Sequence, residues 1–234
     1  QDNPELLKAK ELGIKTLSYP QAFGESLGTK KIIAIAGTAG KSTTTALVSL
    51  ILTKAKFDPT IIIGTKLNNF NGKNFRFGKS DWIIMEADEY KAAFLNYSPT
   101  CAIITNIDFD HSDFYKNLAD VKYTFLKFVN QIKTTGILIL NEDDKNLFSL
   151  KNKIESIAKN KNLKVFWYSL DKIEKPTKTP LFDNLKKSLN LTGKHNMQNA
   201  LLAYGLAKQL KVKDNSIFKA LSDYKGIWRR MEYK

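Results

Sequence analysis

The sequence predicts an α/β fold of the phosphate-loop type: a mostly parallel sheet with helices on both faces. Short apolar runs, the pattern of strands buried on both faces, alternate along the chain with segments of helical spacing. A glycine-rich segment, 37–44, also stands between the first apolar run and a helical segment. Because such sheets bind ligands beyond the carboxyl ends of their strands, the residues that follow each run are the candidates for function.

The individual elements follow from these patterns. Continuous apolar runs predict strands over 32–36, 82–85, 101–105, 137–140 and 164–168. Helical spacing of apolar residues predicts helices over 41–54, 118–132, roughly 143–160, 195–210 and 214–223. Strands and helices that alternate in this way imply βαβ units.

Two segments are expected to differ from this pattern. Residues 170–193 are rich in lysine and proline, and the alternation over 185–191 predicts a loop with a small antiparallel hairpin. Residues 1–30 carry a short helical signal and a linker with proline and glycine, but no fold of their own.

Composition narrows the function classes. The 234 residues hold one cysteine, Cys101, which excludes a disulfide framework and a multi-cysteine zinc site and is expected to be a buried thiol. No apolar run approaches the roughly 18 residues of a membrane span. The net charge is +14, but only Arg76, Arg229 and Arg230 are arginines and the lysines are scattered. We therefore expect a lysine-rich solvated surface and no specific nucleic-acid site.

The strongest functional signal is the glycine-rich segment after the first strand. It contains Gly37, Thr38, Ala39, Gly40, Lys41, Ser42 and Thr43. Glycines let the backbone approach phosphate oxygens, and the N–H groups at the helix start face the anion. Lysine would neutralise phosphate charge, and the serine hydroxyl would ligate Mg²⁺. Ile35 stands where the longer form of this motif has a glycine, so the loop is a shortened one; the alternative is a glycine turn with a capped helix.

Carboxylates follow the second predicted strand. Glu86, Asp88 and Glu89 lie within four residues. Several carboxylates at one strand end are unfavourable unless a cation lies among them, and Mg²⁺ prefers such oxygen ligands. The alternative is a solvated acidic turn.

A histidine follows the third predicted strand. His111, one of two histidines, is flanked by Asp110 and Asp113. A lone histidine is more often structural, but this strand end is expected to face the same crevice as the glycine loop. We therefore predict a metal or phosphate role for His111.

Two further groups lie toward the C-terminus. His195 precedes a predicted helix on which Asn196 and Asn199 share a face, and amides suit an adenine edge. The alternative is a helix cap with a surface asparagine. Arg229 and Arg230 would suit a triphosphate or a carboxylate, or would only be solvated.

Taken in order, these segments resemble the central ATP-binding domain of the Mur ligase family. The likeness rests on the glycine loop, on 86–89, on 106–111, on 195–200 and on Arg229 and Arg230, and it spans about 37 to 230. The acidic box followed by the Asp-His pair resembles most the branch that adds L-alanine and the related murein-peptide ligases. Ala39 departs from this branch, which usually carries histidine there.

The resemblance implies the chemistry and the partners. ATP would phosphorylate the carboxylate of UDP-N-acetylmuramate, and the amine of L-alanine, or of a short peptide, would attack the acyl phosphate. This is a step of peptidoglycan precursor synthesis in the bacterial cytoplasm. Other amide ligases such as the folylpolyglutamate type, and a non-catalytic nucleotide-binding module, remain as alternatives.

The resemblance also implies residue roles. Lys41 would hold the β- and γ-phosphates, Ser42 and Glu86 one Mg²⁺, and His111 a second metal near the substrate. The loop 37–43 with His195, Asn196 and Asn199 would bind the nucleotide, and Arg230 would act in catalysis.

The expected domain organisation follows from the same likeness. Residues 1–30 would be the tail of an N-terminal UDP-sugar domain with its linker, and 31–234 the central domain. The third domain of the family would be absent from this chain.

Overall fold

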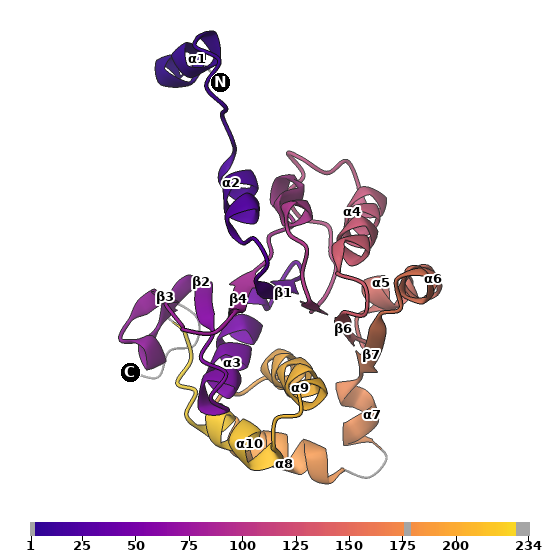
Figure 1. The fold of residues 1–234 in the computed structure, drawn as a ribbon. Helices are drawn as coiled ribbons and strands as arrows, with labels where there is room; N and C mark the ends of the chain where they lie inside the picture. Colours follow the sequence, from indigo (N-terminus) through magenta and orange to yellow (C-terminus); the bar gives the residue numbers. More distant parts are fainter. Residues whose placement is uncertain (1–2, 176–178, 228–234) are drawn as a thin grey trace.

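A seven-stranded sheet forms the centre of the computed structural model, which describes residues 3–175 and 179–227 (Figure 1). Its order is β3-β2-β4-β1-β5-β6-β7, and every neighbouring pair is parallel except β2 and β3. The mostly parallel sheet is confirmed. The strands are β1 (Lys31–Ala36), β2 (Thr60–Leu67), β3 (Lys73–Arg76), β4 (Trp82–Glu86), β5 (Cys101–Ile104), β6 (Ile137–Asn141) and β7 (Lys164–Tyr168).

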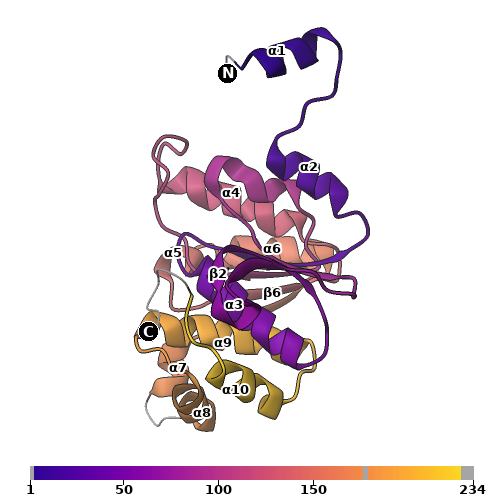
Figure 2. The same cartoon turned by 90° about the vertical axis from the view of Figure 1, so that its left-hand side faces the viewer.

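Helices cover both faces of this sheet (Figure 2). The chain order begins with α1 (Pro4–Glu11), α2 (Tyr19–Ser26), α3 (Lys41–Lys54) and the 3₁₀ segments η1 (Asn68–Phe70) and η2 (Tyr90–Asn96). It continues with α4 (Leu118–Gln131), α5 (Lys145–Phe148), α6 (Lys151–Lys161), α7 (Leu170–Glu174), α8 (Pro180–Ser188), α9 (Lys194–Gln209) and α10 (Asp214–Ser222). The predicted helices at 41–54, 118–132, 195–210 and 214–223 are confirmed.

Two hydrophobic cores result, one on each face. Because side chains alternate along a strand, β1 sends Ile33 and Ile35 into the core with α3 and α9. It sends Ile32, Ala34 and Ala36 into the core with α4 and α6. A central strand that is buried on both sides has no polar face, which is why the run over 32–36 could be identified as a strand.

The segment 170–193 contradicts the sequence prediction. It forms α7 and α8, and the hairpin expected over 185–191 is not there; the antiparallel pair of the sheet is β2 and β3. The Thr179 side chain accepts a hydrogen bond from the Phe182 N–H at 3.3 Å and starts α8, with Pro180 in its first turn. Phe182 and Leu185, three residues apart, then bury one face of that helix.

Two other elements also differ from expectation. The helix predicted over roughly 143–160 is divided into α5 and α6, which Ser149 and Leu150 separate. The strands β2 and β3 were not predicted. Only three isoleucines in succession, at 61–63, mark β2 before Gly64 interrupts the run.

Cys101 lies in β5 and is a free, buried thiol, as predicted. Burial raises the pKa of its thiol to about 12. We expect alkylation by iodoacetamide at pH 8 to be at least about a thousandfold slower in the folded chain than in guanidinium chloride, because the thiolate is the reactive form. Rapid labelling of the folded chain, followed by mass spectrometry, would show that β5 is not buried between the two cores.

Helix α1 packs little against the rest of the domain. None of the residues of α1 is buried, and the helix stands away from the sheet in both views (Figures 1 and 2). The part of the chain that the structure describes contains no helix with the length and apolarity of a membrane span.

Candidate active site

The glycine loop leaves β1 in the middle of the sheet and leads into α3. Gly37 and Gly40 both have positive φ, 138° and 83°. A Cβ atom on Gly37 would lie 2.0 Å from Thr105 Oγ1, and one on Gly40 would lie 2.7 Å from Asn199 Oδ1. Gly37 is therefore required for space as well as for conformation, whereas at Gly40 the conformation favours glycine and a Cβ atom would also displace the Asn199 amide.

The loop is fastened to the end of β5. The Ala39 N–H donates to Asn106 Oδ1 at 2.9 Å, and Asn106 Nδ2 donates to the Ala39 carbonyl at 2.8 Å. Thr105 Oγ1 donates to the same carbonyl at 2.6 Å. These bonds hold the loop in one shape before any ligand arrives, so Thr105 and Asn106 join the residues that build the site.

Lys41 reaches back across the loop. Its Nζ donates to the Gly37 carbonyl at 2.8 Å and to Glu89 Oε2 at 2.7 Å, with Asp88 Oδ1 at 3.7 Å. The Lys41 side chain is 17% exposed and that of Glu89 is 2% exposed. The predicted phosphate ligand is thus already held at the mouth of the loop.

Ser42 and Glu86, the predicted pair of Mg²⁺ ligands, are in contact. Ser42 Oγ donates to Glu86 Oε2 at 3.1 Å, and the Gly64 N–H donates to Glu86 Oε1 at 2.7 Å. Glu86 ends β4, where it pairs in register with Ile35 of β1, and this register brings the carboxylate beside the start of α3. A hydroxyl beside a carboxylate is an oxygen donor set that suits Mg²⁺.

His111 faces Asp88 and Glu89. Its Nε2 lies 3.8 Å from Glu89 Oε1, and one donor atom from each of the three residues lies within 4.8 Å of the others. Glu89 Oε1 is buried without a hydrogen-bond partner among the described residues. An orphaned carboxylate oxygen beside an imidazole fits a cation. Sequence reasoning placed Glu89 in the acidic box but gave it no role of its own.

Contacts with neighbouring tyrosines position His111 and the turn that carries Glu89. The Tyr90 ring lies 4.6 Å from the His111 ring, and Tyr90 Oη donates to Asp113 Oδ2 at 2.7 Å. Burial raises the pKa of Glu89, although the Lys41 ammonium acts in the opposite direction. The Tyr115 hydroxyl donates to the Glu89 carbonyl at 2.6 Å and holds the turn after β4.

The three predicted nucleotide-binding residues of α9 have different surroundings. Asn199 lies against Gly40 of the loop, where its amide oxygen fills the space that a Cβ atom at position 40 would need. Asn196 is buried and donates from Nδ2 to the Thr192 carbonyl at 2.8 Å, and His195 lies beside Gly193. Arg230 and Arg229 fall outside the described residues.

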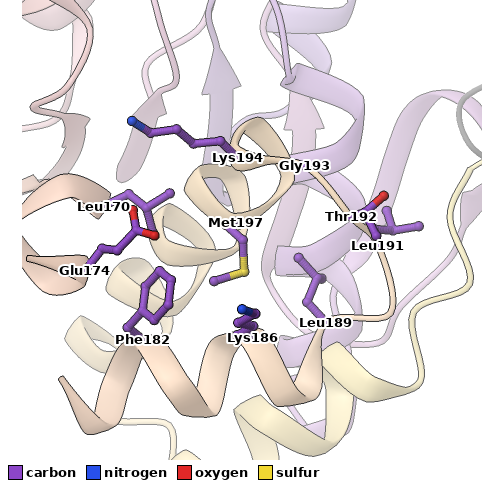
Figure 3. Close-up of a pocket in the computed structure, with 10 residues that line it drawn as sticks. All are labelled: Leu170, Glu174, Phe182, Lys186, Leu189, Leu191, Thr192, Gly193, Lys194 and Met197. Atoms are coloured by element: carbon purple, nitrogen blue, oxygen red, sulfur yellow. The ribbon is translucent and has the colours of Figure 1, made fainter. Parts of the chain in front are cut away.

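A separate cavity of about 430 Å³ lies between α7, α8 and the start of α9 (Figure 3). Met197, Phe182 and Leu189 point into it. Met197 and Asn199 are two residues apart on α9 and hence about 200° apart around the helix. The cavity therefore lies on another face of α9 from the one that contacts the glycine loop.

Fold and site together define an α/β domain of the phosphate-loop type, in which carboxylates line the edge of the glycine loop. Comparison of the sequence with protein families identifies this domain further. The family model described as the Mur ligase middle domain matches residues 35–207. The chain belongs to the Mur ligase family.

Curated relatives cover the whole chain. It is 41% identical to the UDP-N-acetylmuramate–L-alanine ligase of Clostridium acetobutylicum over 250 residues, which are 100% of this chain and 53% of that protein. It is 39% identical to the enzyme of the same name from Persephonella marina, with 100% of this chain and 52% of that protein covered. The chain thus spans about half the length of these relatives.

Solved structures share the fold. The UDP-N-acetylmuramate–alanine ligase from Thermotoga maritima superimposes with a TM-score of 0.76 at 23% identity, covering 99% of this chain and 54% of the other. The UDP-N-acetylmuramate:L-alanyl-γ-D-glutamyl-meso-diaminopimelate ligase from Neisseria meningitides gives a TM-score of 0.77 at 23% identity, with 96% and 75% covered. At sequence identities this low, the superposition shows only that the fold is shared.

Proposed function

We propose that this chain binds ATP with Mg²⁺ and serves as the nucleotide-binding part of a ligase that joins L-alanine to UDP-N-acetylmuramate. One observation carries the proposal: Lys41, Ser42 and Glu86 meet at the preformed glycine loop. The name shared by the two curated relatives described above supports the choice of substrates.

Each group has a role in this proposal. The N–H groups at the start of α3 and the Lys41 ammonium would hold the β- and γ-phosphates. Ser42 and Glu86 would hold one Mg²⁺, and His111 with its neighbouring carboxylates a second cation. The metal would supply neutralisation of phosphate charge, while the loop orients the chain of phosphates.

The proposed reaction has two transfers. A carboxylate oxygen of UDP-N-acetylmuramate takes the γ-phosphoryl group of ATP, and ADP leaves. The amine of L-alanine then attacks the acyl carbon, loses a proton, and expels phosphate as the amide bond forms. This chain contributes to the first transfer by holding the phosphates and excluding other orientations of them.

We also propose the domain organisation that the family likeness implies. Residues 1–30 would belong with an N-terminal UDP-sugar domain and its linker, 31–234 would be the central domain, and a third domain would complete the amino-acid site. The relatives are about twice as long as this chain, which supports this division. The exposed Leu7 of α1 (54%) and Leu12 directly after that helix (62%) support it as well. The proposed location is the bacterial cytoplasm, where the nucleotide-linked precursor is made.

Phosphate release by the natural protein that contains this chain tests the substrates. We expect release to require ATP, UDP-N-acetylmuramate and L-alanine together, and to be lost when any one is omitted. Release with the tripeptide L-alanyl-γ-D-glutamyl-meso-diaminopimelate in place of L-alanine would instead support the reaction named for the Neisseria protein. Release with neither acceptor would contradict the proposed substrates.

A further inference from the structure

We propose that Glu89 is a positioning residue that makes the phosphate loop dependent on a divalent cation. Its carboxylate holds the Lys41 ammonium in place and adds buried negative charge beside the path of an arriving phosphate. The loop would then accept a nucleotide only together with a cation. This inference rests on the proposed binding of ATP at the loop.

The hydrogen bonds of Lys41 show how the ammonium is positioned. A lysine ammonium has three N–H donors. One goes to the Gly37 carbonyl at 2.8 Å and one to Glu89 Oε2 at 2.7 Å. Asp88 Oδ1, at 3.7 Å, is too distant for a third hydrogen bond. The ammonium is therefore fixed by two bonds and keeps one donor for a phosphate oxygen.

The charges at the loop explain the demand for a cation. The carboxylates of Glu86, Asp88 and Glu89 lie around the ammonium and the adjoining Ser42. Glu89 neutralises much of the attraction that Lys41 would offer to an anion, since the two are in direct contact. A metal-free triphosphate would meet net negative charge in a partly desolvated place, where charges interact more strongly than in water.

The second oxygen of Glu89 gives independent support. Oε1 is buried, and no hydrogen bond reaches it from the described residues. It faces His111 Nε2 at 3.8 Å, in the group of donor atoms that includes Asp88. Leaving a buried charged oxygen unpartnered is unfavourable, and a cation held there would relieve it.

Calorimetric titration with a non-hydrolysable ATP analogue, once with Mg²⁺ and once with EDTA, tests the proposal. The measured quantity is the ratio of the two dissociation constants. For the unchanged chain we expect a ratio of about a hundred or more, and for Glu89→Gln a ratio about tenfold smaller, because metal-free binding improves. Glutamine keeps the size and a hydrogen-bond acceptor for Lys41, so a purely structural role would leave the ratio unchanged.

Two further variants make the result decisive. Glu142→Gln is the matched control, because the Glu142 carboxylate is 15% exposed and pairs with Lys172 at 2.6 Å at the end of β6; its ratio should equal that of the unchanged chain. Asp88→Asn, with a side chain 56% exposed, should lower the ratio about threefold. An unchanged ratio in Glu89→Gln would overturn the proposal, whatever the ratio in Asp88→Asn. Failure of the folded, unchanged chain to bind with Mg²⁺ would instead overturn the proposed function.

Discussion

Replacing Lys41 with methionine is expected to abolish measurable nucleotide binding and to lower the free energy of unfolding by about 3 kcal/mol. Binding is lost because the ammonium that would meet the phosphates is gone. Stability falls because Glu89, whose side chain is 2% exposed, would keep a buried carboxylate without its cation. Urea denaturation followed by circular dichroism measures the second effect, and calorimetry the first.

The double variant Lys41→Met with Glu89→Gln separates the two effects. Removing both charges should restore most of the lost stability, since no uncompensated charge is left buried. Nucleotide binding should stay absent. A double variant no more stable than Lys41→Met would show that the pair with Glu89 does not stabilise the fold, and recovered binding would show that Lys41 is not the phosphate ligand.

Replacing Gly37 with alanine is expected to disrupt the loop itself. The new Cβ would lie 2.0 Å from Thr105 Oγ1 and 3.1 Å from the Asn106 nitrogen, at a φ of 138° that alanine avoids. We expect a loss of about 2 kcal/mol in the free energy of unfolding, and at least about a hundredfold weaker nucleotide binding, because the loop must move away from Asn106.

Gly72→Ala is the matched control for this substitution. Gly72 also has a positive φ, 69°, but a Cβ there would meet nothing within 4 Å. It should cost about 1 kcal/mol of stability from backbone strain and leave nucleotide binding unchanged. Equal effects of the two alanines on binding would mean that the fit of Gly37 against β5 is unimportant.

The buried strands could be predicted because their environment leaves a simple signature. β1 contributes to both cores and so reads as an uninterrupted apolar run, and the same holds for β5 and β6. The start of α3 follows from the glycine loop, since Gly40 precedes the first helical residue. Patterns of this kind depend only on near neighbours in sequence.

The wrong predictions concern segments whose secondary structure depends on contacts with residues distant in sequence. The pattern from Leu185 to Leu191 suggests a hairpin, but Leu185 lies inside α8, and Leu189 and Leu191 follow the end of that helix. In β2, burial alternates along the strand, with Ile61, Ile63 and Leu67 buried, but the sequence offers only a run of three isoleucines before Gly64. The strand is therefore defined by its partners β4 and β3.

The sequence predicts which residues belong to the site better than it predicts which of them are in contact. Parallel strands bring their carboxyl ends to one edge, which is why Lys41, Ser42 and Glu86 could be expected to meet. Which carboxylate of 86–89 turns inward could not be read from the residues, because the three have the same chemistry. The turn after β4 buries Glu89 and leaves Asp88 about half exposed, and it gives His111 these partners.

The proposed function depends on the glycine loop binding the phosphates of ATP with Mg²⁺. Titrating the folded chain with a non-hydrolysable ATP analogue and Mg²⁺, beside Gly37→Ala and the Lys41→Met, Glu89→Gln double variant, tests it most directly. We predict saturable binding of one nucleotide to the unchanged chain, binding weakened at least about a hundredfold in Gly37→Ala, and none to the double variant. Equal binding by all three would place the nucleotide elsewhere and contradict binding at the glycine loop.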